Sequence, residues 1–274
     1  MVVVGASGAL VEYDVLPGRS RAYDLLGLTG EAGVVPDVEP GPRVEGVLQS
    51  ENVDDDPAYW ISYPPGSRPG DELPVVVALH GAGRTAETWC DRLSLDVYLA
   101  ASGRRMALAA VDGGLTSYWH ERADGQDPRR MVREEFLPLL AEQGLAADRP
   151  GLLGWSMGGL GVLMLGAELD RDLPVLAVSP ALWPAYDQVM TDLAFDDEEQ
   201  YDECMALARE SLLDGTRVDC GTGDPFYRDV RDVLEDVDVE QHYEPGAHDS
   251  AYWTRELPGQ LDWLAERMSA GGAQ

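Results

Sequence analysis

The five-residue segment 154–158, which reads Gly-Trp-Ser-Met-Gly, constrains the fold of this chain more than any other. It follows the short apolar run 151–153, so the pattern predicts a strand, a sharp turn with Ser156 at its tip, and then a helix. Glycines two positions before and after the serine are needed because a Cβ there would collide with the turn. Gly159 and Gly161 are further small residues where the helix is expected to pack close to its strand. The alternative is an ordinary glycine-rich turn, since the chain contains 30 glycines.

Apolar runs alternate with helical segments from residue 43 onward. Residues 44–48 and 58–63 predict an antiparallel pair of edge strands. Further strands are expected at 73–79, which is apolar throughout and so typical of a strand buried on both faces, and at 106–111, 152–154, 173–179, 217–220 and 239–243. Helices are expected at about 85–101, 128–142, 200–213, 225–234 and 251–268. This alternation indicates an α/β fold with a mostly parallel central sheet and helices on both faces.

We expect one domain over residues 44–274, preceded by an extended lead-in rich in glycine and proline over 1–43. Residues 183–215, which include the acidic stretch 195–201, are expected to form an excursion over the top of the sheet, and the alternative is a solvated surface insertion. Residues 1–10 are apolar but contain no basic residue, so they are not a signal peptide as they stand. A cytoplasmic protein is expected, and the alternative is an exported protein whose charged signal was removed upstream.

The charge of the chain excludes several classes of function. There are 50 acidic and 20 basic residues, a formal net charge of −30, so nucleic acid and anionic membranes are excluded as main partners. All 20 basic residues are arginine. The absence of lysine excludes a Schiff base, a Walker-type phosphate site and a Ser-Lys dyad. No apolar run approaches the roughly 18 residues of a membrane span.

The three cysteines Cys90, Cys204 and Cys220 are odd in number and widely spaced. This pattern indicates neither a disulfide framework nor a zinc knuckle, so free thiols are expected, with one disulfide as the alternative. We expect no metal and no cofactor.

A serine hydroxyl becomes a good nucleophile only when a base removes its proton, and the base is commonly a histidine oriented by a buried carboxylate. Of the four histidines, His248 is favoured because it lies in a Gly/Pro loop between the last strand and the last helix, whereas His242 lies inside the strand. Asp224 follows the preceding strand and is the candidate acid. Its alternative role is to cap the next helix, with Pro225 as the first helical residue, and the two roles are compatible. Asp249 is adjacent to the histidine and is less suitable.

Acyl chemistry on a serine also requires donors for the developing oxyanion. One donor is expected to be the backbone N–H of Met157, at the start of the helix. The second is expected in the loop 80–84 (His-Gly-Ala-Gly-Arg), where the N–H of Ala82 is favoured and Gly83 is the near alternative. His80 is expected to pack beneath this loop as a structural residue.

The pocket mouth is expected to include the loop 112–120 after the next strand. Trp119 and His120 are candidate substrate contacts there, together with Gly83, and plain packing is the alternative for both side chains. Tyr252 and Trp253 are expected to pack the final helix beneath the site.

Four segments resemble the esterase D and antigen 85-type esterases of the α/β-hydrolase superfamily, a group that includes S-formylglutathione hydrolases, siderophore esterases and mycolyltransferases. They are 80–84 (HGAGR), 154–159 (GWSMGG), 219–227 (DCGTGDPFY) and 245–253 (PGAHDSAYW). The resemblance spans roughly residues 44–269 and implies an α/β-hydrolase fold, a cofactor-free serine esterase or acyltransferase, and catalytic roles for Ser156, Asp224 and His248. The similar mycolyltransferases place a glutamate as the acid, so Asp224 is closer to the esterase D members. The lysine-free, glycine-rich composition resembles actinobacterial members. Some of those carry a twin-arginine export signal before a segment similar to 15–20, and no twin arginine precedes it here.

We therefore predict a serine hydrolase that cleaves a small-molecule carboxylic or thio ester through an acyl-enzyme on Ser156. One alternative is acyl transfer to an alcohol or sugar. The other is a non-catalytic binding protein on the same fold, because fold alone does not fix function.

Overall fold

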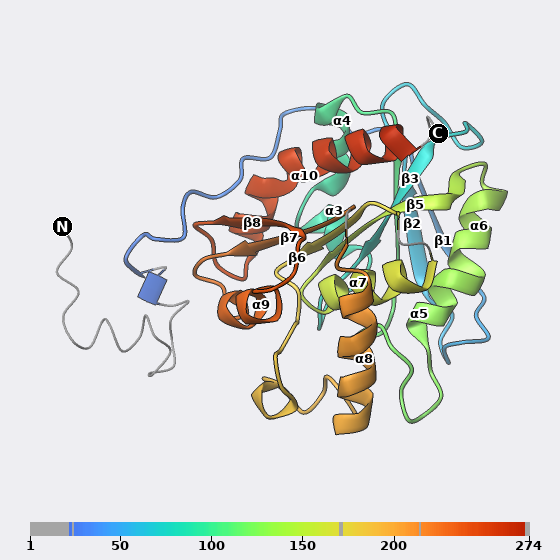
Figure 1. Cartoon of the computed structure of the whole chain (residues 1–274). Coiled ribbons are helices and arrows are strands. Elements are labelled where there is room, and N and C mark those ends of the chain that lie inside the picture. Colours follow the sequence, from blue (N-terminus) through green and yellow to red (C-terminus); the bar gives the residue numbers. More distant parts are fainter. Residues whose placement is uncertain (1–21, 24, 170–171, 214, 272–274) are drawn as a thin grey trace.

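The computed structural model describes residues 22–271 except 24, 170–171 and 214. One eight-stranded sheet runs through this part of the chain in the order β1-β2-β4-β3-β5-β6-β7-β8 (Figure 1). The strands are β1 (Arg43–Val47), β2 (Ala58–Ser62), β3 (Pro74–Leu79), β4 (Ala107–Val111), β5 (Ala146–Trp155), β6 (Val175–Val178), β7 (Thr216–Gly221) and β8 (Glu240–Glu244). Strands β3 to β8 are mutually parallel, while β1 pairs antiparallel with β2 and β2 antiparallel with β4. The predicted mostly parallel sheet is therefore confirmed.

Helices cover both faces of the sheet (Figure 1). One face packs against α3 (Thr88–Asp91), α4 (Leu95–Ser102) and α10 (Ser250–Gly271). The other is covered by α5 (Pro128–Met131), the π-helical turn η1 (Val132–Phe136), α6 (Leu137–Glu142), α7 (Met157–Leu169) and α9 (Tyr227–Val233), and α8 (Glu198–Glu210) packs against α7. A 3-10 turn, η2 (Tyr186–Gln188), precedes α8. Along β3, Val75, Val77 and Leu79 enter one core while Val76 and Ala78 enter the other, so burial on both faces explains why this strand is apolar throughout.

Two expected helices are interrupted. The segment 85–101 divides into α3 and α4 because Ser94, between them, adopts the left-handed conformation (φ +51°). The segment 128–142 contains the π turn η1, which ends two residues before Pro138. Proline has no N–H to continue the α-helical ladder, and a π turn is one way to accommodate that loss.

The excursion 183–215 joins the core. Helix α8 packs against α7 and buries Tyr201, Cys204 and Met205. A surface insertion that is solvated throughout is therefore excluded for its described residues. The N-terminal lead-in is described from Ala22, and residues 29–33 lie against α10: Gly33 donates its N–H to Ala251 O (3.1 Å) and Arg255 donates to Thr29 O (3.2 Å). The expectations for residues 1–21 lie outside the described residues.

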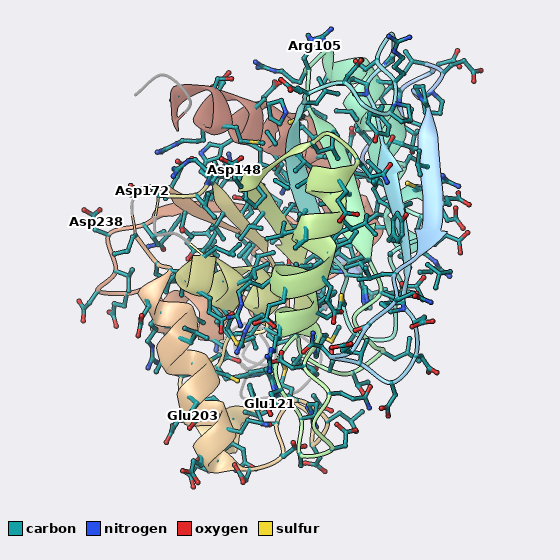
Figure 2. The ribbon with its side chains drawn as sticks, turned by 90° about the vertical axis from the view of Figure 1, so that its right-hand side faces the viewer. Arg105, Glu121, Asp148, Asp172, Glu203 and Asp238 are labelled. Atoms are coloured by element: carbon teal, nitrogen blue, oxygen red, sulfur yellow. The ribbon has the colours of Figure 1, made fainter. Side chains whose placement is uncertain are left out.

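Charged side chains project from the outside of the molecule (Figure 2). Glu121 and Glu203 lie at the end toward which the parallel strands run, and Arg105, just before β4, lies at the opposite end (Figure 2). The three cysteines are buried free thiols, as expected. None of the described helices combines the length and the apolar character that crossing a bilayer requires.

Candidate active site

Ser156 lies between β5 and α7 with its backbone in the left-handed region (φ +55°), as the sequence predicted. This conformation is unfavourable for a residue with a Cβ and persists only when its surroundings fix it. Here the N–H of Ser156 donates to Val178 O (2.9 Å), and its carbonyl accepts the N–H groups of Leu160 (3.2 Å) and Ala181 (3.0 Å). The turn is thus tied to β6, to the loop after β6 and to the first turn of α7.

The two flanking glycines cannot be replaced without moving backbone. A Cβ on Gly154 would clash with the carbonyl of Gly158, and a Cβ on Gly158 would clash with the carbonyl of Leu79 at the end of β3. Because backbone atoms cannot rotate away as a flexible side chain can, both positions require glycine. The ordinary glycine-rich turn is therefore excluded in favour of the strained strand-to-helix elbow.

The structure brings Ser156, His248 and Asp224 together from three different loops. His248 Nε2 lies 3.0 Å from Ser156 Oγ, and His248 Nδ1 lies 2.8 Å from Asp224 Oδ2. The Asp224 side chain is fully buried, and that of His248 is 23% exposed. Asp224 Oδ1 accepts the N–H of Phe226 (2.8 Å), so one carboxylate is bonded both to the turn before α9 and to the imidazole. The helix begins two residues after Pro225, which corrects the expected start.

Backbone hydrogen bonds join the aspartate loop to the histidine loop. Thr222 N–H donates to Glu244 O (2.8 Å) and Gly223 N–H donates to Gly246 O (2.7 Å). Gly246 lies against the ring of Tyr252, where a Cβ would clash. These contacts fix the distance between the two loops through the main chain, and the close approach of the loops explains their glycines.

The rejected candidates have other partners. His242 lies in β8, with Nε2 3.9 Å from Glu244 and 3.6 Å from Glu256. Asp249 Oδ1 accepts the N–H of Tyr252 (3.1 Å) in the first turn of α10. Neither residue contacts the Ser156 hydroxyl in the described structure.

The backbone N–H groups of Ala82 and Met157 have no hydrogen-bond partner among the described residues. Ala82 is exposed in the cavity that contains Ser156, and Met157 begins the 13-residue helix α7, whose dipole favours negative charge at this end. Gly83 is different, because its N–H donates to Leu115 O (2.7 Å). Because the N–H of Gly83 is already bonded, the N–H of Ala82 is the better candidate for the oxyanion donor. Gly83 allows the loop to turn through its left-handed conformation (φ +68°).

His80 is buried beneath this loop as expected. Its Nε2 accepts the N–H of Gly113 (3.0 Å), so the ring proton resides on Nδ1, which donates to Gly81 O (3.0 Å). Burial lowers the pKa of His80, which favours the neutral ring. A neutral imidazole with both nitrogens occupied is a structural group that supports the loop.

Trp119 and His120 do not reach the Ser156 cavity, which corrects their expected roles. The Trp119 side chain is fully buried, donates Nε1–H to His80 O (3.1 Å) and fills the space beside Gly113 and Gly161. The missing side chain at Gly161 therefore makes room for the indole of Trp119, and not for close packing of α7 against β5 as expected. Its neighbour in the sequence is also buried: His120 Nδ1 lies 2.8 Å from Glu121 O and Nε2 lies 2.8 Å from Ala194 O, and burial lowers its pKa.

Gly159, the other small residue after the elbow, lies against Pro180 in the loop after β6. It permits close packing, as expected, but its neighbour is a loop and not the preceding strand.

A cavity of about 270 Å³ opens at the Ser156 hydroxyl. One wall is aromatic: Trp155 and Trp253 stack with ring centroids 5.2 Å apart, and Trp253 also meets the His248 ring edge-on at 5.1 Å. The expected position of Trp253 beneath the site is thus wrong, whereas Tyr252 is buried as expected. Sequence reasoning also missed further lining residues, namely Arg84, Thr88, Arg92, Leu93, Asp249 and Ser250. Several flank α3 or precede α10, and only the position of those helices could have identified them.

The loop after β4 lines a different cavity, of about 570 Å³, that includes Asp112, Gly114 and Ser117. Arg84 borders both cavities. The expectation that this loop forms the mouth of the serine pocket is therefore corrected to an adjacent position. No cluster of metal-binding side chains is found among the described residues.

Residues 50–264 match the protein family described as "Putative esterase". The chain belongs to this family. One curated relative is esterase Rv0045c of Mycobacterium tuberculosis, which is 31% identical over 115 residues, covering 41% of this chain and 35% of the relative. The match thus spans about a third of that relative's length.

Solved structures with the same fold include an S-formylglutathione hydrolase from Agrobacterium tumefaciens, with a TM-score of 0.67, 17% identity, and coverage of 87% of this chain and 99% of that one. The fluorophosphonate-binding serine hydrolase FphF of Staphylococcus aureus has a TM-score of 0.67, 17% identity, and coverage of 83% and 99%. These similarities establish the α/β-hydrolase fold. Together with the family match, they confirm the resemblance inferred from its motifs.

Proposed function

We propose that this protein is a serine esterase that forms an acyl-enzyme on Ser156. The observation that carries the proposal is the continuous contact from Ser156 Oγ through His248 to the buried Asp224 carboxylate, with distances of 3.0 and 2.8 Å. Membership of an esterase family supports the same reaction class.

In the proposed reaction, His248 Nε2 removes the proton from Ser156 Oγ as the oxygen attacks the ester carbonyl carbon. The carbonyl oxygen becomes an oxyanion and accepts the N–H groups of Ala82 and Met157. The imidazolium, held by Asp224, then protonates the departing alcohol oxygen as the C–O bond breaks. Water attacks the acyl-enzyme, gives its proton to His248, and releases the carboxylic acid when Ser156 recovers a proton.

The test is hydrolysis of a short 4-nitrophenyl ester by the wild type and by Ser156→Ala and His248→Ala, with His242→Ala as the matched histidine control. We expect both site variants to lose at least about a thousandfold in kcat, as removal of a triad member does elsewhere. His242→Ala should remain within a few-fold of wild type. Full activity in folded Ser156→Ala would refute the assignment.

Two further measurements separate the alternatives. A fluorophosphonate probe should label the wild type and not Ser156→Ala, and a folded wild type that stays unlabelled would favour the non-catalytic binding protein. Product analysis with an added alcohol separates hydrolysis from acyl transfer, because transfer yields a new ester in place of the free acid.

A further inference from the structure

Two arginines, Arg84 and Arg92, line the cavity that contains Ser156 and His248. Arg84 follows the Ala82 loop and Arg92 is the C-cap of α3, so they lie on either side of this short helix. Both side chains are exposed to the cavity and its solvent. The proposed nucleophile thus faces a space bordered by two positive charges.

These two guanidinium groups have no acidic partner among the described residues. Most other described arginines do, as the pairs Arg104–Asp262, Arg122–Asp196, Arg129–Glu168, Arg130–Glu134, Arg217–Asp219 and Arg267–Glu240 illustrate. With 50 acidic residues for 20 arginines, carboxylate partners are plentiful in this chain. Two unpaired arginines in the same cavity therefore leave donors available for a bound anion.

The remaining charge in the cavity does not cancel theirs. Asp249 also lines it, but its single negative charge stands against the two positive charges of Arg84 and Arg92. Outside the cavity the net charge of −30 opposes the binding of anions. An anion that reaches the serine therefore requires local recognition, and the cavity has two groups suited to it.

The rest of the cavity indicates what accompanies the anion. Trp155, Trp253 and Leu93 form an apolar wall, and the volume of about 270 Å³ is just below the range of roughly 300–1,000 Å³ typical of drug-sized ligands. Such a space suits a small apolar or aryl group that carries a single charged end.

We propose that the preferred substrates are small esters with a carboxylate on the part that enters this cavity, bound by Arg84 and Arg92. This inference rests on the proposed esterase reaction at Ser156. Arg84 and Arg92 are then specificity-determining residues: they bind the carboxylate and take no part in the proton transfers.

The experiment compares matched anionic and neutral esters. 4-Nitrophenyl hydrogen adipate has a carboxylate at the end of its acyl chain, and 4-nitrophenyl hexanoate has an acyl chain of the same length without it. 4-Acetoxybenzoate has a carboxylate on its alcohol part, and 4-acetoxybenzamide has a neutral amide in its place. The readout is the ratio of kcat/KM for the anionic ester to that for the neutral one, measured for wild type, Arg84→Gln, Arg92→Gln and the double variant. Arg105→Gln is the matched control, because Arg105 is also exposed, does not line the cavity and lies just before β4, whereas Arg84 follows the end of the parallel strand β3.

We expect the ratio for one pair of esters to fall about two- to fivefold in each single variant, because this is the change in affinity that an exposed ion pair typically contributes. The ratio should fall further in the double variant. Arg105→Gln should leave the ratio unchanged, and added salt should lower the ratio in wild type. If the ratio is unchanged in the double variant while the neutral esters are still cleaved, the carboxylate proposal is overturned and the esterase proposal stands. An equal fall for anionic and neutral esters also overturns it. A folded wild type that cleaves none of the four esters and is not labelled by fluorophosphonate overturns both proposals.

Discussion

Replacing Asp224 with asparagine tests the orientation of the imidazole with little change in shape. Asp224 Oδ1 accepts the N–H of Phe226 at 2.8 Å, and an asparagine Oδ1 preserves that bond. The amide NH₂ is then placed where Oδ2 now lies, 2.8 Å from His248 Nδ1. Because an NH₂ group donates, Nδ1 must become the acceptor and the ring proton moves to Nε2. That proton faces Ser156 Oγ at 3.0 Å, so His248 no longer accepts the serine proton.

The expected loss in kcat is about 10⁴-fold, the cost of the wrong tautomer in a serine triad, which corresponds to roughly 5.5 kcal/mol of transition-state stabilisation. The free energy of unfolding should change by only about 1 kcal/mol, because one hydrogen bond is exchanged for another. Asp224→Ala should lose similar activity but also about 1–3 kcal/mol of stability, since the N–H of Phe226 is left unpaired.

The assay measures kcat and KM on a short 4-nitrophenyl ester, together with urea unfolding of each variant. Asp148→Asn is the control, because Asp148 is exposed near the start of β5 and does not line the cavity that contains Ser156; it should retain activity within a few-fold. A kcat for Asp224→Asn within tenfold of wild type would show that the Asp224 carboxylate does not orient the base.

Three further predictions concern the surroundings of the site. Gly158→Ala should prevent stable folding, because its Cβ would meet the carbonyl of Leu79. Gly259→Ala, in α10 with open space around it, should instead raise the free energy of unfolding by about 0.5–1 kcal/mol. Equal melting temperatures for the two variants would contradict this reasoning. Trp119→Phe should lower stability by about 1–3 kcal/mol through loss of the bond to His80 O and leave KM unchanged, so a raised KM with intact stability would restore Trp119 as a substrate contact. Burial lowers the pKa of His80 below its usual 6.5, so the imidazole binds a proton more readily in the unfolded chain than in the folded protein. The free energy of unfolding should therefore fall as the pH drops below about 6.5, and His80→Gln should reduce this fall. Identical curves of stability against pH for wild type and His80→Gln would rule out His80 as a cause.

The backbone of the site was predictable because its geometry depends on glycine. The elbow, the Ala82 loop and the two loops that carry Asp224 and His248 each require a close approach or an unusual φ, and such requirements are visible in the sequence. The order of strands along the chain then placed these loops at one edge of the sheet. The contact between Ser156, His248 and Asp224 was anticipated from these signals and from the resemblance to a known family, whereas the catalytic role of these residues and the oxyanion role of Ala82 stay predictions.

The side chains that line the cavity were not predictable in the same way. Arg92 and Leu93 enter it only because α3 packs where it does, and Trp253 does so because α10 begins beside the histidine loop. Trp119 was misplaced because its loop ends near the site while its indole turns inward, into space left by Gly113 and Gly161. Those two glycines were the available signal, but their pairing across 48 positions becomes apparent only in three dimensions.

The proposed base is carried by the edge of the sheet. His248 follows β8, which among the described strands pairs only with β7, whereas Ser156 follows β5 in the interior of the sheet. An edge strand is held by ladder hydrogen bonds on one side only, so fewer contacts oppose its local opening than oppose that of an interior strand. Detachment of β8 would carry the imidazole away from an intact elbow, so moderate heating should inactivate the protein reversibly at temperatures where its core is still folded. The temperature at which activity is lost is then set by how stably the five-residue strand β8 pairs in the sheet. Substitutions that stabilise this pairing should raise that temperature.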